Sequence, residues 1–136
     1  MNKVFLDAAY AIALSAPNDQ CHERAELLAE QLEANGSQLI TTRAVMLEIG
    51  NALAKLRYRN DAIELLDSLE EDPNVEIISI SEKLYQRAFE LYRERRDKEW
   101  GLTDCISFVV MKDRDLKNAL TADEHFKQAG FNALLL

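Results

Sequence analysis

The feature of this sequence that most constrains its fold is an alternation of short apolar segments with longer segments of helical spacing. Apolar runs predict five strands, at residues 3–6, 38–41, 75–80, 118–121 and 131–135. Helical periodicity between them predicts helices at residues 8–14, 43–56, 60–70, 81–97 and 103–111. It also predicts that the helical region after residue 14 includes residues 23–33 and stops at Asn35-Gly36. Such alternation favours an α/β fold: a central parallel sheet of four to five strands with helices on both faces.

Length and composition narrow the class of protein. The 136 residues are expected to form one domain over residues 1–136, and the 48% hydrophobic content excludes disordered and fibrous classes. Two cysteines, Cys21 and Cys105, lack metal-ligand spacing and fit a reducing compartment. Asp7 interrupts the only apolar run near the N-terminus, and no run reaches the roughly 18 residues of a membrane-spanning helix. We therefore expect a soluble, cytoplasmic protein that does not contact a membrane.

Four acidic residues lie close to predicted strand–helix junctions. Asp7 directly follows the first strand, and Asp123 follows the fourth. Glu48 lies in the helix after the second strand, and Asp104 opens the helix of residues 103–111. Because ligands of open parallel sheets bind beyond the carboxyl ends of the strands, we expect these four acids to converge. Ionised carboxylates crowd together only around a cation, and Mg²⁺ or Mn²⁺ prefers such oxygen ligands.

Each acid also has a structural interpretation. Asp7 and Asp123 can act as helix N-caps, and Asp104 can interact with the positive end of its helix. Glu48 is harder to explain in this way, because its spacing places it on or beside the apolar stripe of its helix, where a lone acid is costly. The coincidence of four acids favours a binding site.

Four short motifs, in this order along almost the whole chain, resemble those of the PIN-domain nucleases, which include the VapC-type toxin ribonucleases of bacterial toxin–antitoxin pairs. The matching segments are F-L-D-A-A-Y, T-T-R-A-V-M-L-E-I-G-N, L-T-D-C-I-S-F-V-V-M and A-L-T-A-D-E-H-F-K-Q-A-G-F. The resemblance implies a PIN-like three-layer sandwich with a five-stranded parallel sheet. It also implies Mg²⁺- or Mn²⁺-dependent hydrolysis of phosphodiester bonds, usually in single-stranded RNA, and an antitoxin protein as partner.

The family's acidic quartet corresponds to Asp7, Glu48, Asp104 and Asp123. We assign Asp7, Asp104 and Asp123 to direct metal ligation, whereas Glu48 is expected either to bind a second ion or to position water. The supporting hydroxyl positions of the family correspond to Thr42 and Thr103. The family often has a hydroxyl residue directly after its first Asp, where this chain has Ala8-Ala9, so one supporting hydrogen bond is expected to be missing.

The remaining reactive and aromatic side chains are expected to be structural. We predict exposed or supporting roles for His22 and His125, because neither forms a zinc pattern with a cysteine. Cys105 lacks a basic partner and is predicted to be a small core residue. Four aromatic residues at core-like spacing are predicted to be buried: Phe89, Tyr92, Phe108 and Phe126.

The net charge of −8 argues against a nucleic-acid partner, yet the basic residues are clustered. The clusters are Lys55, Arg57 and Arg59, and then Arg93, Arg95, Arg96 and Lys98. They are interpreted either as solvated helix ends or as a rim that holds RNA phosphates. A homodimer is also expected, with Leu65, Leu66 and Leu69 as candidates for its interface.

Individual residues of this chain argue against two other α/β classes with acidic sites. A haloacid-dehalogenase-like phosphatase requires a second Asp two positions after Asp7, where this chain has Ala9. A response-regulator receiver requires an Asp after its third strand, where this chain has Ile80-Ser81. One alternative remains open, a catalytically inactive PIN-like module that binds other proteins.

Overall fold

A computed structural model describes residues 2–136, and its centre is a five-stranded parallel sheet in the order β3-β2-β1-β4-β5. The strands are β1 (Lys3–Leu6), β2 (Gln38–Thr42), β3 (Val75–Ile78), β4 (Asn118–Leu120) and β5 (Asn132–Ala133). The helices are α1 (Ala8–Ser15), α2 (His22–Ala34), α3 (Arg43–Ala52), α4 (Leu56–Glu71), α5 (Glu82–Glu94), α6 (Leu102–Asp113) and α7 (Glu124–Gln128). The predicted α/β class and parallel sheet are confirmed.

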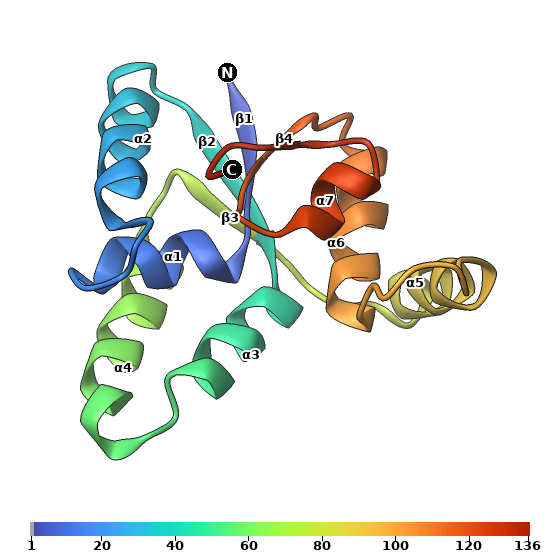
Figure 1. Ribbon diagram of the computed structural model, residues 1–136, viewed down its shortest axis with the longest axis horizontal. Helices are drawn as coiled ribbons and strands as arrows, with labels where there is room; N and C mark the ends of the chain where they lie inside the picture. The colour runs from blue at the N-terminus through green and yellow to red at the C-terminus, as the bar shows by residue number, and fades with distance from the viewer. Residues whose placement is uncertain (1) are drawn as a thin grey trace.

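The helices form two outer layers around the sheet. Helices α1, α2 and α4 lie on one side of it, and α5, α6 and α7 lie on the other (Figure 1). Helix α3 follows β2 and contacts α1, α4 and α6, so it joins the two layers at one end of the sheet. Within residues 2–136, no helix is long and apolar enough to span a bilayer.

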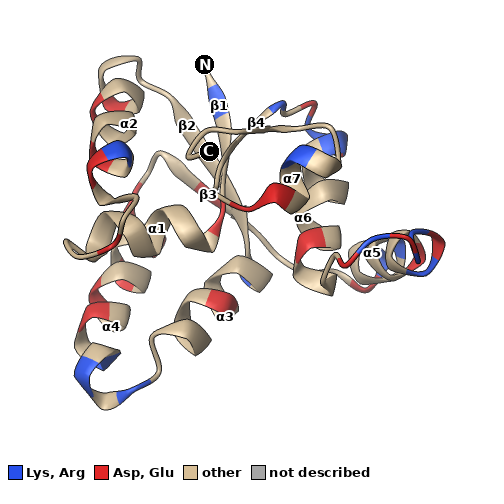
Figure 2. Ribbon diagram, in the orientation of Figure 1, with Lys and Arg blue, Asp and Glu red and all other residues tan. Residues whose placement is uncertain are grey.

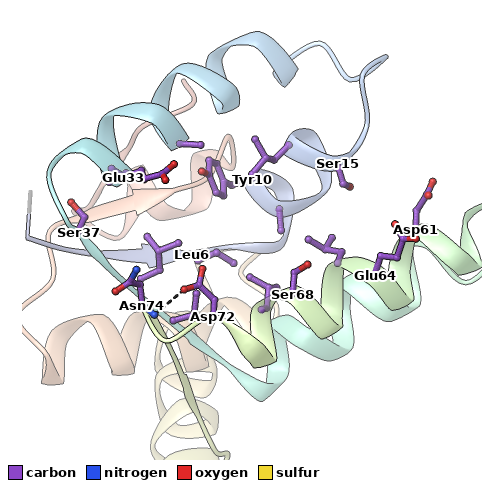
Figure 3. A pocket seen from close by; sticks show the side chains of 18 residues that line it. Leu6, Tyr10, Ser15, Glu33, Ser37, Asp61, Glu64, Ser68, Asp72 and Asn74 are labelled. Carbon is purple, nitrogen blue, oxygen red and sulfur yellow. Dashed lines mark hydrogen bonds between the residues drawn. The ribbon is translucent and has the colours of Figure 1, made fainter.

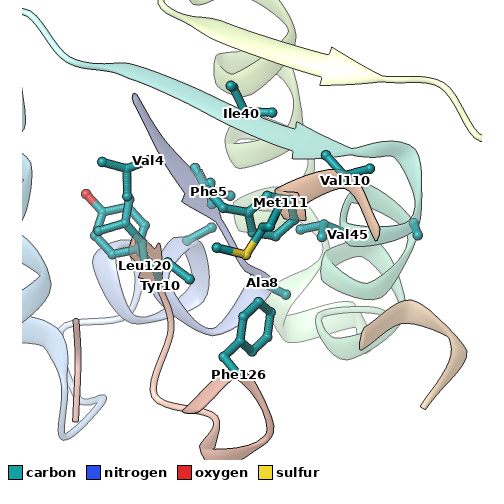
Figure 4. Close-up of a cluster of buried hydrophobic side chains, with 14 of the residues drawn as sticks. Val4, Phe5, Ala8, Tyr10, Ile40, Val45, Val110, Met111, Leu120 and Phe126 are labelled. Atoms are coloured by element: carbon teal, nitrogen blue, oxygen red, sulfur yellow. The ribbon is translucent and has the colours of Figure 1, made fainter. Parts of the chain in front are cut away.

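The core forms around the central strand because both faces of a parallel sheet are covered by helices. Val4, Phe5 and Leu6 of β1 are all buried, which explains why this strand is a continuous apolar run. Phe126 of α7 packs on Phe5, with ring centroids 6.1 Å apart, and meets Phe108 of α6 edge-on at 5.0 Å (Figure 4). Helices α6 and α7 are therefore fixed against β1 by aromatic packing.

The order of the strands reverses direction between β1 and β4, which makes this the switch point of the sheet. In register, Phe5 of β1 lies opposite Ile40 of β2 on one side and Ala119 of β4 on the other. The chain leaves β1 toward α1 and leaves β4 toward α7, in different layers. The carboxyl ends of β1 and β4 therefore border the crevice where open parallel sheets bind ligands, and Asp7 and Asp123 are placed there.

Several predicted element boundaries are wrong. The helix predicted to reach Leu56 ends at Ala52, and Leu56 starts α4 with 91% of its surface exposed. The apolar spacing thus continues across a break at residues 53–55, where Lys55 has an extended backbone. Helix α5 ends at Glu94 instead of reaching Asp97, and β3 ends at Ile78 instead of Ile80.

Some predicted core residues are exposed. Phe89 and Tyr92 of α5 are 39% and 46% exposed, because the face of α5 that packs inward carries Leu84 and Ala88. Ile63 of α4, which lies three residues before the half-buried Leu66, is likewise 50% exposed.

The predicted dimer residues do not form an exposed apolar patch. Leu69 is buried, and Leu65 and Leu66 are half-buried and pack against the core. The apolar face of α4 that carries them is turned toward the rest of the molecule, as expected of an amphipathic helix on a sheet. Leu65, Leu66 and Leu69 are therefore not accessible enough to form a dimer interface.

Candidate metal centre

Asp7 is a buried carboxylate at the end of β1, with only 6% of its surface exposed. It occupies the N-cap position of α1, but its side chain makes no capping hydrogen bond. The capping interpretation therefore does not account for it. Burial raises the pKa of Asp7 to about 6, with further contributions from the charges of Asp104 and Asp123 and an opposing hydrogen bond from Thr121.

Thr121 is a supporting residue that the sequence did not reveal. Its fully buried hydroxyl donates to Asp7 Oδ2 at 2.7 Å and accepts from the backbone N–H of Asp123 at 3.0 Å. Asp7 thus receives a hydroxyl hydrogen bond from Thr121, directly after β4, although Ala8-Ala9 supply none. The only signal in the sequence was a polar residue directly after the apolar segment of β4, which is also typical of an ordinary strand end.

Asp104 and Asp123 both lie close to the ring of His125. Asp104, in the first turn of α6, accepts at Oδ2 from the Gly101 N–H at 3.1 Å and contacts His125 Nδ1 at 3.0 Å. Asp123 Oδ1 accepts from the backbone N–H of His125 at 2.9 Å and lies 3.4 Å from its Nδ1. One potential ligand atom from each of these three residues lies within 4.8 Å of the others. Asp104 and Asp123 therefore each accept a backbone hydrogen bond at the start of a helix and also lie close to one another.

Glu48 faces the same region from α3, whose start is capped by the Thr42 hydroxyl through the Val45 N–H. Its side chain is exposed rather than part of the apolar stripe, because α3 buries the neighbouring positions 44–46 and 49. Partial desolvation raises the pKa of Glu48 to about 7, together with the charges of Asp7, Asp104 and Asp123.

The structure thus brings the four acids predicted from the sequence into one electrostatically coupled group. Figure 2 shows acidic segments of α3, α6 and the chain before α1 and α7 around one end of the sheet. Burial also raises the pKa of Asp104, and the neighbouring charge of Asp123 adds to this effect. Because mutual repulsion and desolvation both disfavour the ionised acids, the group fits a hard divalent cation bound through oxygen.

Three other residues singled out from the sequence have contacts that do not involve the four acids. Cys105 is free and buried in the core, and burial raises the pKa of its thiol to about 11, which disfavours the reactive thiolate near neutral pH. His22 contacts the Ala13 carbonyl through Nδ1 at 2.7 Å and Glu26 through Nε2 at 3.2 Å. Thr103 is half-buried, and its carbonyl accepts from the Ser107 hydroxyl.

A wide groove lies away from the four acids. It is a groove of about 760 Å³ formed by α1, α2, α4 and the adjacent strands (Figure 3). Its lining combines leucines such as Leu14, Leu32 and Leu69 with four acids, namely Glu33, Asp61, Glu64 and Asp72. We call this surface the α1–α2–α4 groove. Its lining contains none of the four acids, which lie at the carboxyl edge of the sheet.

Comparison with known proteins finds relatives over nearly the whole chain. The chain is 24% identical over 128 residues to the 23S rRNA-specific endonuclease VapC20 of Mycobacterium tuberculosis, covering 94% of this chain and 95% of that protein. The crystal structure of VapC20, described as a Sarcin-Ricin loop cleaving toxin, superposes with a TM-score of 0.82 over the same shares of the two chains.

Two further solved structures share the fold at lower identity. VapBC2 from Rickettsia felis, solved bound to a DNA fragment from its promoter, is 16% identical, with a TM-score of 0.69 over 96% of both chains. FitAcB from Neisseria gonorrhoeae is 19% identical, with a TM-score of 0.66 over 96% of this chain and 95% of that one. The family model for the PIN domain matches residues 4–132. The chain therefore belongs to the PIN domain family.

Proposed function

We propose that this protein is a Mg²⁺- or Mn²⁺-dependent endoribonuclease and the toxin of a toxin–antitoxin pair. The observation that carries the proposal is the gathering of Asp7, Glu48, Asp104 and Asp123 at the carboxyl edge of the sheet, where burial and then the charges of the three aspartates raise the pKa of Glu48. Four coupled carboxylates at the switch point are costly without a cation, and a scaffold gains nothing from them. Similarity to an endonuclease specific for 23S rRNA supports RNA, and ribosomal RNA in particular, as the substrate.

In the proposed mechanism the three aspartates and Glu48 have different roles. Asp7, Asp104 and Asp123 would hold the ion through carboxylate oxygens, and the Thr121 hydroxyl would orient Asp7. A bound divalent ion supplies an activated water and positive charge beside the phosphate. Glu48, which lies beside the three aspartates, would accept the proton of that water.

The test is cleavage of total ribosomal RNA by the purified protein with Mn²⁺ or Mg²⁺, compared with EDTA and with Asp104→Asn. Asn keeps the shape of the side chain and removes its charge. Loss of a direct ligand should exceed the roughly 10- to 100-fold cost typical of losing a ligand's hydrogen-bonding partner. Asp67→Asn, on the exposed surface of α4, is the matched control and should cleave like the wild type.

The alternative, an inactive PIN-like binding module, makes a different prediction. It requires that no RNA is cleaved and that calorimetry detects no Mn²⁺ binding by the wild type. Ion binding that disappears in Asp104→Asn, with no cleavage of ribosomal RNA, would keep the metal site and reject ribosomal RNA as the substrate.

The α1–α2–α4 groove suits the antitoxin partner. Its apolar floor can bury the apolar face of a helix, and its four acids favour basic residues at the helix edge. We therefore propose that a basic amphipathic helix of the antitoxin binds there. Glu64→Lys should weaken the complex with the co-expressed antitoxin, measured by calorimetry, whereas Glu90→Lys on α5 should leave its affinity unchanged.

A homodimer remains part of the proposal, but through α5 instead of α4. Tyr85, Phe89 and Tyr92 form an exposed aromatic row, with neighbouring ring centroids 6.2–6.3 Å apart. Glu82 begins this helix and Arg93 lies in its last turn, so an antiparallel second copy would place opposite charges together. Phe89→Glu should convert a dimer into a monomer in light scattering; an unchanged mass would reject this interface.

A further inference from the structure

His125 makes contacts that connect two acids of different helices. Its Nδ1 lies 3.0 Å from Asp104 Oδ2 at the start of α6 and 3.4 Å from Asp123 Oδ1 at the start of α7. Its own backbone N–H donates to the same Asp123 oxygen at 2.9 Å. The ring is about one-third exposed, and its neighbour Phe126 is fully buried against β1. The imidazole is therefore held in place by the core at the edge of the acidic group.

The contact with the two carboxylates assigns the hydrogen of the ring to Nδ1. Ionised Asp104 and Asp123 only accept hydrogen bonds, so the ring contacts them as a donor when it carries its hydrogen on Nδ1. A nitrogen that carries a hydrogen has no free lone pair with which to bind a metal ion. In this arrangement Nδ1 of His125 is a hydrogen-bond donor to the acids and not a ligand.

The bonds also leave specific oxygens free. Within residues 2–136, Asp104 Oδ1 and Asp123 Oδ2 accept no hydrogen bond, whereas the opposite oxygen of each carboxylate is occupied. Without a donor between them, the two carboxylates would repel one another and separate. The ring thus keeps both carboxylates close together and oriented, with one oxygen of each unoccupied.

We propose that His125 is a positioning residue that holds Asp104 and Asp123 at a fixed separation before a divalent ion binds. This inference rests on the proposed metal-dependent function and adds a residue to it. A hydrogen bond from outside the ligand set that orients a metal ligand typically contributes 10- to 100-fold to metal affinity. Removing the imidazole should therefore weaken ion binding without removing a ligand.

The experiment is calorimetric titration of the purified protein with MnCl₂, comparing His125→Ala and His125→Asn with the wild type. In Asn the amide nitrogen takes the place of Nδ1 and keeps a donor, whereas Ala removes it. We expect the Mn²⁺ Kd of His125→Ala to rise about 10- to 100-fold and that of His125→Asn to stay within about threefold of the wild type. His22→Ala is the matched control, because His22 contacts Ala13 and Glu26 instead of these acids.

Nitrogen-15 NMR of labelled imidazole provides a readout that does not depend on activity. The hydrogen on Nδ1 of His125 should be visible in the ion-free protein and should persist after saturation with Mg²⁺. Its loss on Mg²⁺ binding would make His125 a ligand and overturn the proposal. Circular dichroism of each variant verifies that it is folded before titration.

The outcomes separate this proposal from the function on which it rests. A wild type that binds no Mn²⁺ overturns both. If the wild type binds Mn²⁺ and His125→Ala binds it as tightly or more tightly, only the positioning role is rejected. If His125→Asn loses as much affinity as His125→Ala, the donor at Nδ1 is not the cause, and the proposal is also rejected.

Discussion

Substituting Asn for Asp7 should stabilise the ion-free protein at neutral pH and have little effect in acid. The pKa of Asp7 rises from 3.8 to about 6 on folding, so the folded state binds the proton more tightly than the unfolded chain. The free energy of unfolding then falls as pH rises from about 4 to about 6, because the unfolded state loses its proton first. At about 1.36 kcal/mol per pKa unit, the ionised Asp7 costs about 3 kcal/mol at pH 7.5.

The assay is urea unfolding in EDTA at pH 4 and pH 7.5, followed by circular dichroism. Asp7→Asn should exceed the wild type by about 3 kcal/mol at pH 7.5 and by less than about 1 kcal/mol at pH 4. Asp67→Asn, exposed on α4, controls for the loss of one negative charge. A stabilisation equal at both pH values would refute the reasoning, because it would show that ionisation of Asp7 does not oppose folding.

Three further predictions follow from the same contacts. Thr121→Val should lower the free energy of unfolding, measured in urea, by about 1.5–3 kcal/mol, because it removes the hydrogen bond to the buried Asp7. Thr121→Ser keeps a hydroxyl and should retain most of the stability that Thr121→Val loses. Phe126→Ala should cost about 3–5 kcal/mol, measured by calorimetric unfolding, because its ring is fully buried against Phe108; a cost under about 1 kcal/mol would contradict this packing. Glu48→Gln should cleave RNA more slowly than the wild type in a gel assay, because an amide cannot accept the proton of the attacking water; cleavage equal to that of the wild type would contradict this role.

The relation between sequence and structure differs between the acids and their supporting residues. The positions of Asp7 and Asp123 follow from local patterns, because Asp7 directly follows the apolar strand β1 and Asp123 comes three residues after β4. Glu48 was predicted for a partly wrong reason: its side chain is exposed, and what links it to the site is the charge of the three aspartates. The metal-ligating roles of these acids remain predictions that the calorimetric titrations test.

Exposure was the property that the sequence predicted least well. The spacing of Phe89 and Tyr92 is that of a core-facing row, yet both lie on the exposed side of α5. Likewise, Leu56 continues the period of the preceding helix but begins α4 and is exposed. Periodicity shows which residues share a helix face, whereas the packing of neighbouring elements decides which face is covered.

The sequence by itself determined the order of strands and helices and the four acids near their junctions, because these depend on periodicity within short segments. Only the tertiary structure decided which partners orient those acids. Thr121 reaches Asp7 across 114 positions of the chain, and His125 reaches Asp104 across 21. Such contacts arise because β1 pairs with β4 and α7 packs beside α6, and no local pattern encodes that pairing.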